Sequence, residues 1–374
     1  MKRVFISITI LLTILNISCS KDNGNVIKLG AVTPLTGPIS TYGENIRDGI
    51  LLAVDEINKS GGIDGGRIKI IFEDEGDGPR SAVNSVRKLI NINNVQAIIG
   101  PATSDGVLAA APIAEKNKTV LLSPSATSNN IREAGDYIFR NRASASQEAS
   151  IFTEYIISEL NVMTFGVLRA DADYALSFIE VCRNVIDEKG GQILIEEVFN
   201  EGSTDYRSQL SKIKALSPQG IFIIGVPSEL GIILNQINEL GIKSRLFSNT
   251  IDSPQIFKIA EGAAEGLTFV TTFYDPNYGG KYIKEFDNKF KKEYGRASHI
   301  FGANAYDAVY LLKTAIETHG RKGEQIKEGL YDIENFNGAA GITEFDNKGD
   351  LKFTKVAIKK ISEGEFKFIK EVQK

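Results

Sequence analysis

The sequence predicts an α/β fold with two lobes, each built around a parallel sheet. From residue 26 onward, short β-rich apolar runs alternate with amphipathic stretches of helical period. Repeated β–α units favour a parallel sheet with helices on both faces. A chain of 374 residues that is 42% hydrophobic and 24% charged has ordinary globular composition and enough length for two cores.

The first series of elements predicts an N-terminal lobe. Residues 43–62 place four aliphatic side chains on one helical face and end in two glycines, as an amphipathic helix does. Apolar segments around this helix predict strands at residues 26–33, 67–74, 95–100 and 119–123.

A second series with the same alternation predicts a C-terminal lobe. Strands are expected at residues 162–170, 191–199, 220–226 and 244–249, with helices up to residue 189, near 205–216 and near 228–240. The last third adds helices near residues 279–293, 302–318 and 323–334, then strands at 351–361 and 365–372. No linker rich in glycine or proline divides the lobes, so we expect ordinary strand-like crossings that can act as a hinge.

The N-terminus predicts an export signal. Two cations precede an apolar run of 14 residues, too short for a comfortable transmembrane helix but suited to a signal peptide over residues 1–18. Cys19 ends this run and a polar tether (residues 19–25) follows it, which resembles the lipobox of bacterial lipoproteins and implies acylation of Cys19. Asn16 departs from that motif, and the alternative is an ordinary secretory signal. Both interpretations predict an exported protein, periplasmic or on the cell surface.

Charge and cysteine content exclude several classes. The formal net charge is −4 and the cations are dispersed, so we expect no binding to nucleic acid, and contact with the membrane only through the N-terminal lipid. Besides Cys19 the chain contains only Cys182, in an amphipathic helical pattern that predicts a buried thiol and no disulfide.

Motifs for catalysis, metals and cofactors are absent from the sequence. The acidic residues 72–80 lack the alternating spacing of a calcium loop and predict a solvated turn. The glycines of residues 60–67 follow a helix and precede a strand, the reverse of a dinucleotide fingerprint. An enzyme would have to rely on Asp171, Asp173 and Asp252. We therefore expect no enzyme, no metal and no cofactor.

Polar loops follow the predicted strands. In open α/β sheets ligands bind beyond the carboxyl ends of the strands, and four loops qualify: residues 34–43, 101–106, 124–130 and 171–175. Two of these loops offer hydroxyls and free main-chain N–H groups, which are suited to holding a carboxylate. The alternative is that the hydroxyls only cap helices, with Ser104 as one N-cap and Thr127 or Ser128 as another.

Four stretches together carry a family resemblance. They read "KLGAVTPLTGPISTYGENIRDGILLAVDEIN", "GGIDGGRIKIIFEDE", "AIIGPATSDGVLAAAPIAEKNKTVLLSPSATS" and "EGLTFVTTFY". In this order, from residue 26 to about residue 356, the chain resembles the branched-chain amino acid binding proteins of ABC importers, the type I periplasmic binding proteins. The resemblance implies two Rossmann-like lobes joined by a three-strand hinge, with the ligand held between them. The implied lobes are residues 26–142 plus 272–354 and residues 143–271 plus 355–374.

The resemblance also implies roles for individual residues. Ser104, Thr127 and the main chain around Ser125 and Ala126 would hold the ligand carboxylate, and Tyr42, Tyr174 and Phe301 would line the site. The full set of ligand-binding residues we expect is Tyr42, Ala102, Thr103, Ser104, Ser125, Ala126, Thr127, Tyr174, Val226, Asn249, Asp252 and Phe301.

The chain departs from the family pattern at the second lobe. Where the family usually places an acidic residue for the ligand ammonium, this chain has Asn249, which accepts a hydrogen bond but carries no charge. Asp252 could substitute, and the alternative is that it caps a helix before Ser253. Val226 replaces an often aromatic residue. These departures argue against branched-chain specificity.

We therefore expect a monomeric solute-binding lipoprotein that captures an amino acid or a related small polar solute and delivers it to an ABC permease. The alternative is a binding protein that serves a sensor kinase or chemoreceptor.

Overall fold

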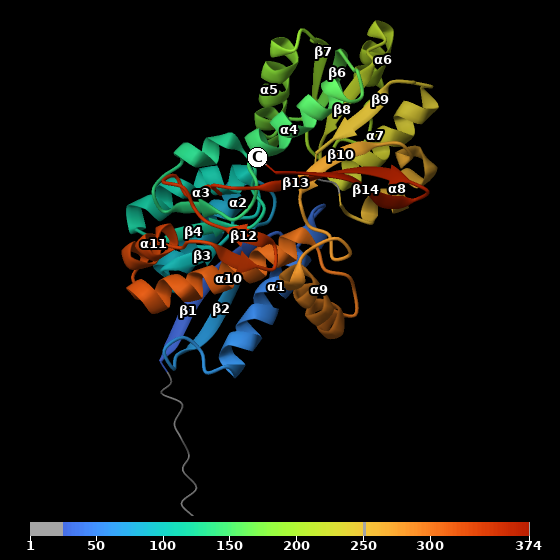
Figure 1. The fold of residues 1–374 in the computed structure, drawn as a ribbon. Helices are drawn as coiled ribbons and strands as arrows, with labels where there is room; N and C mark the ends of the chain where they lie inside the picture. Colours follow the sequence, from blue (N-terminus) through green and yellow to red (C-terminus); the bar gives the residue numbers. More distant parts are fainter. Residues whose placement is uncertain (1–24, 250–251, 374) are drawn as a thin grey trace, which may run out of the picture.

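Two lobes lie next to each other in the computed structural model, which describes residues 25–249 and 252–373 (Figure 1). Cys19 and the predicted signal segment lie outside these residues. None of the helices in the described part of the chain is both long and apolar enough to cross a bilayer.

The N-terminal lobe is built on a five-stranded parallel sheet with the order β2-β1-β3-β4-β5. Its strands are β1 (Val26–Thr33), β2 (Arg67–Asp74), β3 (Ala97–Ile99), β4 (Val120–Ser123) and β5 (Ile138–Arg140). Its helices are α1 (Ser40–Lys59), α2 (Pro79–Asn91), α3 (Ser104–Asn117), α9 (Lys281–Tyr294), α10 (Ile300–His319) and α11 (Gly323–Tyr331).

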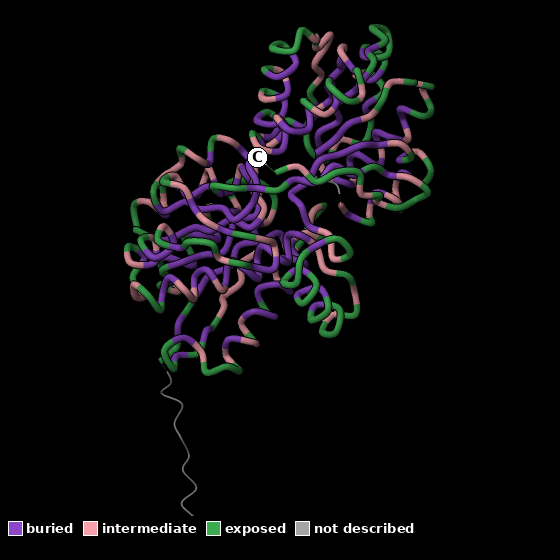
Figure 2. The backbone as a smooth tube through the Cα atoms, in the orientation of Figure 1, coloured by how far each residue is buried: buried purple, intermediate pink, exposed green. Residues whose placement is uncertain are grey.

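Alternation along the strands gives this sheet two buried faces. Leu29 and Ile99 pack in one cluster with side chains of α1, α9, α10 and α11, whereas Val32 and Ile98 pack in another with side chains of α2 and α3. Successive side chains of a strand point to opposite faces, so a parallel sheet covered on both sides needs apolar residues at every position. In Figure 2 much of the backbone in the interior of this lobe is coloured as buried.

The C-terminal lobe contains a seven-stranded sheet with the order β14-β13-β10-β9-β8-β6-β7. Strands β6 (Thr164–Ala170), β7 (Gln192–Phe199), β8 (Gly220–Ile224), β9 (Arg245–Ser248) and β10 (Thr268–Thr272) run parallel, and β13 (Lys355–Ser362) and β14 (Glu365–Gln373) are antiparallel. The helices are α4 (Ala145–Ser158), α5 (Asp173–Glu188), α6 (Arg207–Leu216), α7 (Pro227–Glu239) and α8 (Gln255–Ala260).

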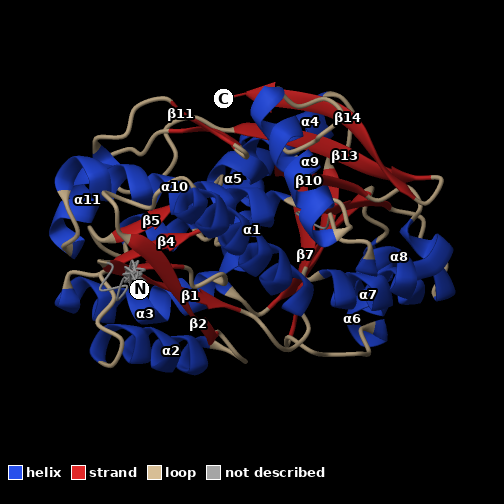
Figure 3. Ribbon diagram, turned by 90° about the horizontal axis from the view of Figure 1, so that it is seen from below, coloured by secondary structure: helices blue, strands red, loops and turns tan. Residues whose placement is uncertain are grey.

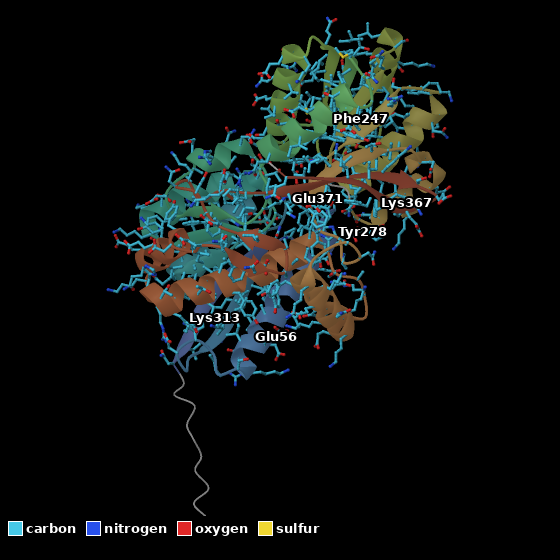
Figure 4. The ribbon with its side chains drawn as sticks, viewed as in Figure 1. Glu56, Phe247, Tyr278, Lys313, Lys367 and Glu371 are labelled. Atoms are coloured by element: carbon cyan, nitrogen blue, oxygen red, sulfur yellow. The ribbon has the colours of Figure 1, made fainter. Side chains whose placement is uncertain are left out.

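The core of this lobe is rich in aromatic rings. Phe247 of β9, labelled in Figure 4, packs against Phe222 at 5.7 Å and Phe152 at 6.0 Å between ring centroids. Cys182 of α5 is buried in the same core as predicted, and burial raises the pKa of its thiol to about 12.

The chain passes between the lobes three times: after β5, after β10 and before β13. The two antiparallel strands β13 and β14 lie at the side of the molecule where the lobes meet, as the views in Figures 1 and 3 both show. The residue boundaries assigned to the lobes from the sequence stay predictions.

Most elements agree with the sequence within a few residues, and the differences have local causes. The helix expected at residues 43–62 begins at Ser40 and ends at Lys59, because Gly61 and Gly62 take positive φ values. The strand expected from residue 351 begins at Lys355, since Leu351 forms an isolated bridge to Phe345 instead. The three-residue strands β5, β11 (Phe336–Gly338) and β12 (Gly341–Thr343) are too short to carry a recognisable pattern.

A buried arginine ties two of the crossings together. Arg140, at the end of β5, donates from Nε to Asp350 Oδ1 at 2.6 Å and from Nη2 to Asp350 Oδ2 at 2.8 Å. Its Nη1 donates to the main-chain oxygen of Ser128 at 2.6 Å. The side chain of Arg140 is 1% exposed, so every one of these bonds is made in the interior.

We predict that Arg140→Leu lowers the free energy of unfolding by about 3–5 kcal/mol, because the Asp350 carboxylate loses both bonds to its buried cation and keeps only a 3.3 Å contact with the partly exposed Arg132. The double variant with Asp350→Leu should lose less than the single variant. Urea unfolding measures both. As a control, Lys118→Ala, which breaks an exposed pair with Glu324, should cost no more than about 1 kcal/mol. A loss below 1 kcal/mol for Arg140→Leu would contradict the prediction.

Candidate functional site

Two polar loops meet at the carboxyl edge of the N-terminal sheet. One follows β3 and the other follows β4, and these strands are neighbours. Ser104 Oγ accepts hydrogen bonds from the main-chain N–H groups of Thr127 and Ser128, both at 3.1 Å. Ser125 Oγ donates to the oxygen of Ala102 at 2.7 Å. The structure therefore brings together the two loops that sheet geometry singled out.

The capping roles differ from expectation. The N-cap of α3 is Thr103, which accepts from Gly106 N–H at 3.1 Å, and Ser104 is the first helical residue. The assignment of Ser104 as N-cap is wrong, because its hydroxyl turns toward the neighbouring loop. Ser128, one of the two candidates for the second cap, does cap the short helix η1 (Asn129–Glu133) by accepting from Asn130 N–H.

The side chain of Glu75 holds the loop after β3 in place through hydrogen bonds. Its buried carboxylate accepts from the N–H groups of Ala102 at 2.8 Å and Thr103 at 3.0 Å, and from the Thr103 hydroxyl. Burial raises the pKa of this carboxyl group, against the opposing effect of those donors. The sequence-based interpretation of residues 72–80 as a solvated turn is wrong here, since Glu75 is 2% exposed. Its position directly after β2, at the same sheet edge, was the available signal.

Most main-chain donors of these loops are already used within the lobe. Besides the two held by Glu75, Ala126 N–H donates to Ser123 Oγ at 3.2 Å and Thr127 N–H to Ser104 Oγ. The expectation of free N–H groups is therefore wrong at these four positions and at Ser128, whereas the N–H groups of Ser104 and Ser125 make no hydrogen bond to the described residues. The hydroxyl proton of Ser104 stays available, because its oxygen only accepts the two bonds described above.

Three rings from α1 and the start of α10 form what we call the aromatic group: Tyr42, His299 and Phe301. Tyr42 stacks on His299 with 5.9 Å between centroids and meets the edge of Phe301 at 4.7 Å. The guanidinium of Arg142 lies 5.1 Å from the centroid of Phe301. The Tyr42 hydroxyl is buried without a hydrogen-bond partner in the described part of the chain, and burial raises its pKa.

On the C-terminal lobe, Tyr174 and Asp252 lie near enough to this group to interact with it electrostatically, and Asn249 directly follows β9. Tyr174 lies in the first turn of α5, and the pKa of its buried hydroxyl is raised by burial, by Glu229 and Glu201, and by Tyr42 across the junction. Asn249 is 9% exposed. Among the described residues, neither the Tyr174 hydroxyl nor the Oδ1 atom of Asn249 has a hydrogen-bond partner.

Asp252 does not cap a helix. Its Oδ2 pairs with Lys359 Nζ of β13 at 2.9 Å, and its buried Oδ1 has no partner within residues 25–249 and 252–373. Helix α8 begins without a side-chain N-cap bond. The capping alternative is therefore wrong, and one carboxylate oxygen is left facing the interior.

Val226 stands apart from this arrangement. It is the N-cap residue of α7, and its N–H donates to Glu229 Oε2 at 3.1 Å. No hydrogen bond, ring contact or charge contact in the described residues joins it to the other predicted site residues.

Direct bonds join the lobes beside the polar loops. Asp173 of α5 accepts from the Ser128 hydroxyl and, at 3.0 Å, from Asn130 Nδ2. Ser177 Oγ accepts from Asn129 N–H at 3.2 Å. Nearby, burial raises the pKa of Glu201 to about 7, and the charge of neighbouring carboxylates adds to it. The described structure thus has its lobes in contact at this edge.

Residues missed by the sequence-based analysis include Glu75, Arg142 and His299. Arg142 is buried and donates from Nη2 to Glu148 Oε1 at 3.0 Å, which also accepts from Thr272 at the end of β10. A single arginine that becomes buried on folding leaves no sequence pattern. No cluster of ligating side chains that could hold a metal ion occurs among the residues described.

We predict that His299 makes the protein less stable in acid. Burial lowers its pKa to about 4, opposed by the Asp252 carboxylate and main chain and assisted by Lys359 and Arg142. An unfolded chain takes up the proton near pH 6.5, so this contribution to stability is present above about pH 6.5 and is lost as the pH falls toward 4, by at most about 3 kcal/mol.

The measurement is urea unfolding of the native chain and of His299→Asn, which keeps an N-cap acceptor, between pH 7 and 4. Raised carboxyl pKa values such as that of Glu201 act in the opposite direction, and they cancel in the comparison. The variant should lose less stability than the native chain over this range. Parallel curves would refute the prediction.

Comparisons with known proteins agree with this geometry. Over 334 residues, 88% of each chain, the sequence is 28% identical to the leucine-, isoleucine-, valine-, threonine- and alanine-binding protein of Pseudomonas aeruginosa. The structure matches the branched-chain amino acid transporter substrate-binding protein LivJ of Streptococcus pneumoniae, solved with isoleucine. That match has a TM-score of 0.87 at 27% identity and covers 94% of this chain and 100% of the other.

The leucine-binding protein LivK of Thermotoga maritima matches equally, with a TM-score of 0.87 at 27% identity over 92% of this chain and 98% of its own. A family model described as periplasmic binding protein matches residues 26–364. The resemblance found in the sequence is confirmed, and this family consists of solute-binding proteins rather than enzymes. The chain belongs to the periplasmic binding protein family.

Proposed function

We propose that this protein binds an amino acid between its lobes and delivers it to an ABC-type importer. The observation that carries the proposal is a set of buried polar atoms, from both lobes, without hydrogen-bond partners among the described residues. They are the Tyr42 and Tyr174 hydroxyls, Nε2 of His299, Oδ1 of Asn249 and Oδ1 of Asp252. A buried polar group left unpaired costs about 1–3 kcal/mol, so five around one junction indicate a place for ligand groups.

The two ends of an α-amino acid fit opposite sides of the junction. The hydroxyls of Ser104 and Thr127 on the N-terminal lobe would donate to the carboxylate. Oδ1 of Asn249 and Oδ1 of Asp252 on the other lobe are acceptors, suited to the ammonium group. Asp252 supplies the charge that Asn249 lacks, although Lys359 shares it. Relatives that bind leucine and isoleucine, by their names, support an amino acid as ligand.

Binding would couple to closure of the lobes. A ligand that contacts both lobes favours the closed form by its differential affinity for that form, and the importer would recognise the closed surface. The bonds from Ser128 and Asn130 to Asp173 join the lobes directly and would break when they open. No bond chemistry is required.

We predict that Ser104→Ala weakens amino acid binding about 10- to 100-fold, because a carboxylate loses a hydroxyl donor. A thermal-shift screen with the twenty standard amino acids, amides, small peptides and aromatic acids identifies the ligand, and calorimetry measures the variant. Asn249→Leu should weaken the same ligand from the other lobe.

The matched control is Ser85→Ala, since Ser85 is also buried in the N-terminal lobe but donates to the Asp74 main chain at 2.6 Å. It should lower stability and leave affinity unchanged. Unchanged affinity in Ser104→Ala would remove Ser104 from the site. No response to any amino acid in the screen would refute the proposed function.

We also propose that Cys19 carries a lipid that anchors the exported protein to a membrane. The Cys19→Ala variant should then move from the membrane fraction to the soluble exported fraction, because one change removes the acylated residue. Fractionation after labelling with a radioactive fatty acid tests this. A native chain that takes up no label would show an ordinary secretory signal instead.

A further inference from the structure

His299 occupies a distinctive place in the aromatic group. Its imidazole contacts both other rings of the group, with 5.9 Å between centroids to Tyr42 and 4.8 Å to Phe301. Asp252 and Lys359 of the C-terminal lobe and Arg142 of the first crossing all act on it electrostatically. The ring therefore lies at the junction of the lobes, against two residues expected to line the ligand site.

The hydrogen bond at Nδ1 determines which ring nitrogen of His299 carries the proton. Phe301 N–H donates to Nδ1 at 3.2 Å, so Nδ1 is the acceptor nitrogen. A neutral imidazole with Nδ1 as acceptor carries its proton on Nε2. Burial lowers the pKa of His299 to about 4, so the ring is neutral near pH 7. His299 consequently points a single N–H donor away from its own helix.

Within residues 25–249 and 252–373 that donor makes no hydrogen bond of ordinary geometry, although the main chain of Asp252 lies near enough to raise the pKa of the ring. Nε2 is buried without a hydrogen-bond partner, as is the hydroxyl of Tyr42 stacked beside it. The nearest acid, Asp252, already binds Lys359 through Oδ2. If an aliphatic ligand side chain filled this place, the N–H of His299 would stay unpaired in a water-poor site, which disfavours such a ligand.

We propose that His299 determines the side-chain specificity of the site, its Nε2–H donating a hydrogen bond to an oxygen atom on the side chain of the ligand. The inference rests on the proposed function and names its substrate class: amino acids with a hydroxyl or amide oxygen in the side chain, in preference to leucine, isoleucine and valine. A site built to hydrogen-bond a substrate atom rejects the analogue that lacks it far more strongly than an apolar pocket rejects a polar isostere.

The test uses two pairs of ligands with nearly equal shape: L-threonine against L-valine, and L-asparagine against L-leucine. Calorimetry is carried out at pH 7.5, about one unit above the ordinary pKa of histidine. In at least one of the two pairs, the native chain should bind the polar amino acid at least about tenfold more tightly than its aliphatic partner.

Three variants separate hydrogen bonding from structure. His299→Leu removes the donor and should abolish the polar preference. His299→Asn keeps an N-cap acceptor but has no atom at the Nε2 position, so it should abolish the preference while retaining the helix start. His299→Gln can place an amide N–H near that position and should restore part of it. Circular dichroism confirms that each variant is folded.

Two outcomes would overturn the inference. One is a native chain that binds valine and leucine as tightly as threonine and asparagine. The other is a polar preference that persists unchanged in His299→Leu and His299→Asn. Both outcomes leave amino acid binding, and hence the proposed function, in place. Failure of all four amino acids to bind, where another class of solute does, would instead refute the proposed function and this inference with it.

Discussion

The Arg140 guanidinium must find its hydrogen-bond acceptors inside the protein, because water does not reach it. It finds them in Asp350, on the approach to β13, and in the main chain of Ser128, at the end of a site loop. One cation thus connects the first crossing, the third crossing and the polar loop after β4. Removing one partner of a buried ion pair is strongly destabilising. The Arg140–Asp350 pair therefore constrains the position of the first and third crossings relative to the polar loop after β4.

The two polar loops depend on side-chain hydrogen bonds for their conformation. Parallel strands bring the loops after β3 and β4 to one edge, but the loop conformations are held by side chains: Glu75 under the first loop, and Ser104 and Ser123 under the second. These bonds consume main-chain donors that would otherwise face a ligand. Recognition of an anionic ligand group is therefore left mainly to hydroxyls, whose protons can rotate toward it.

The charges at the junction between the lobes are distributed unevenly. Arg142 pairs with Glu148 and Lys359 pairs with Asp252 near the aromatic group. Near Tyr174, burial raises the pKa of Glu201, and the like charges of Glu229, Asp105 and Asp171 raise it further. Closing the lobes brings like charges together on that side. The bonds that Ser128 and Asn130 make to Asp173 offset part of this repulsion by satisfying one of the carboxylates.

The sequence by itself determined the α/β class, the order of strands and helices and the two loops after β3 and β4. These features follow from local hydrophobic period and from the rule that parallel strands end at one edge. The family resemblance pointed to Tyr42, Tyr174, Asn249 and Phe301, whose roles as ligand contacts remain proposals. Helix caps were less predictable, as Ser104 shows, because a hydroxyl near a helix start can also bond to a neighbouring loop.

Only the tertiary structure decided which polar groups are already satisfied and which are left over. Glu75 and Arg140 are accommodated in the interior because their partners come from other segments, 27 residues away for Ala102 and 210 residues away for Asp350. The partnership of Asp252 with Lys359, 107 residues away, likewise depends on a contact that no local pattern encodes. Satisfaction of a buried polar atom is a property of three-dimensional neighbours, and those neighbours exist only once the lobes have folded and met.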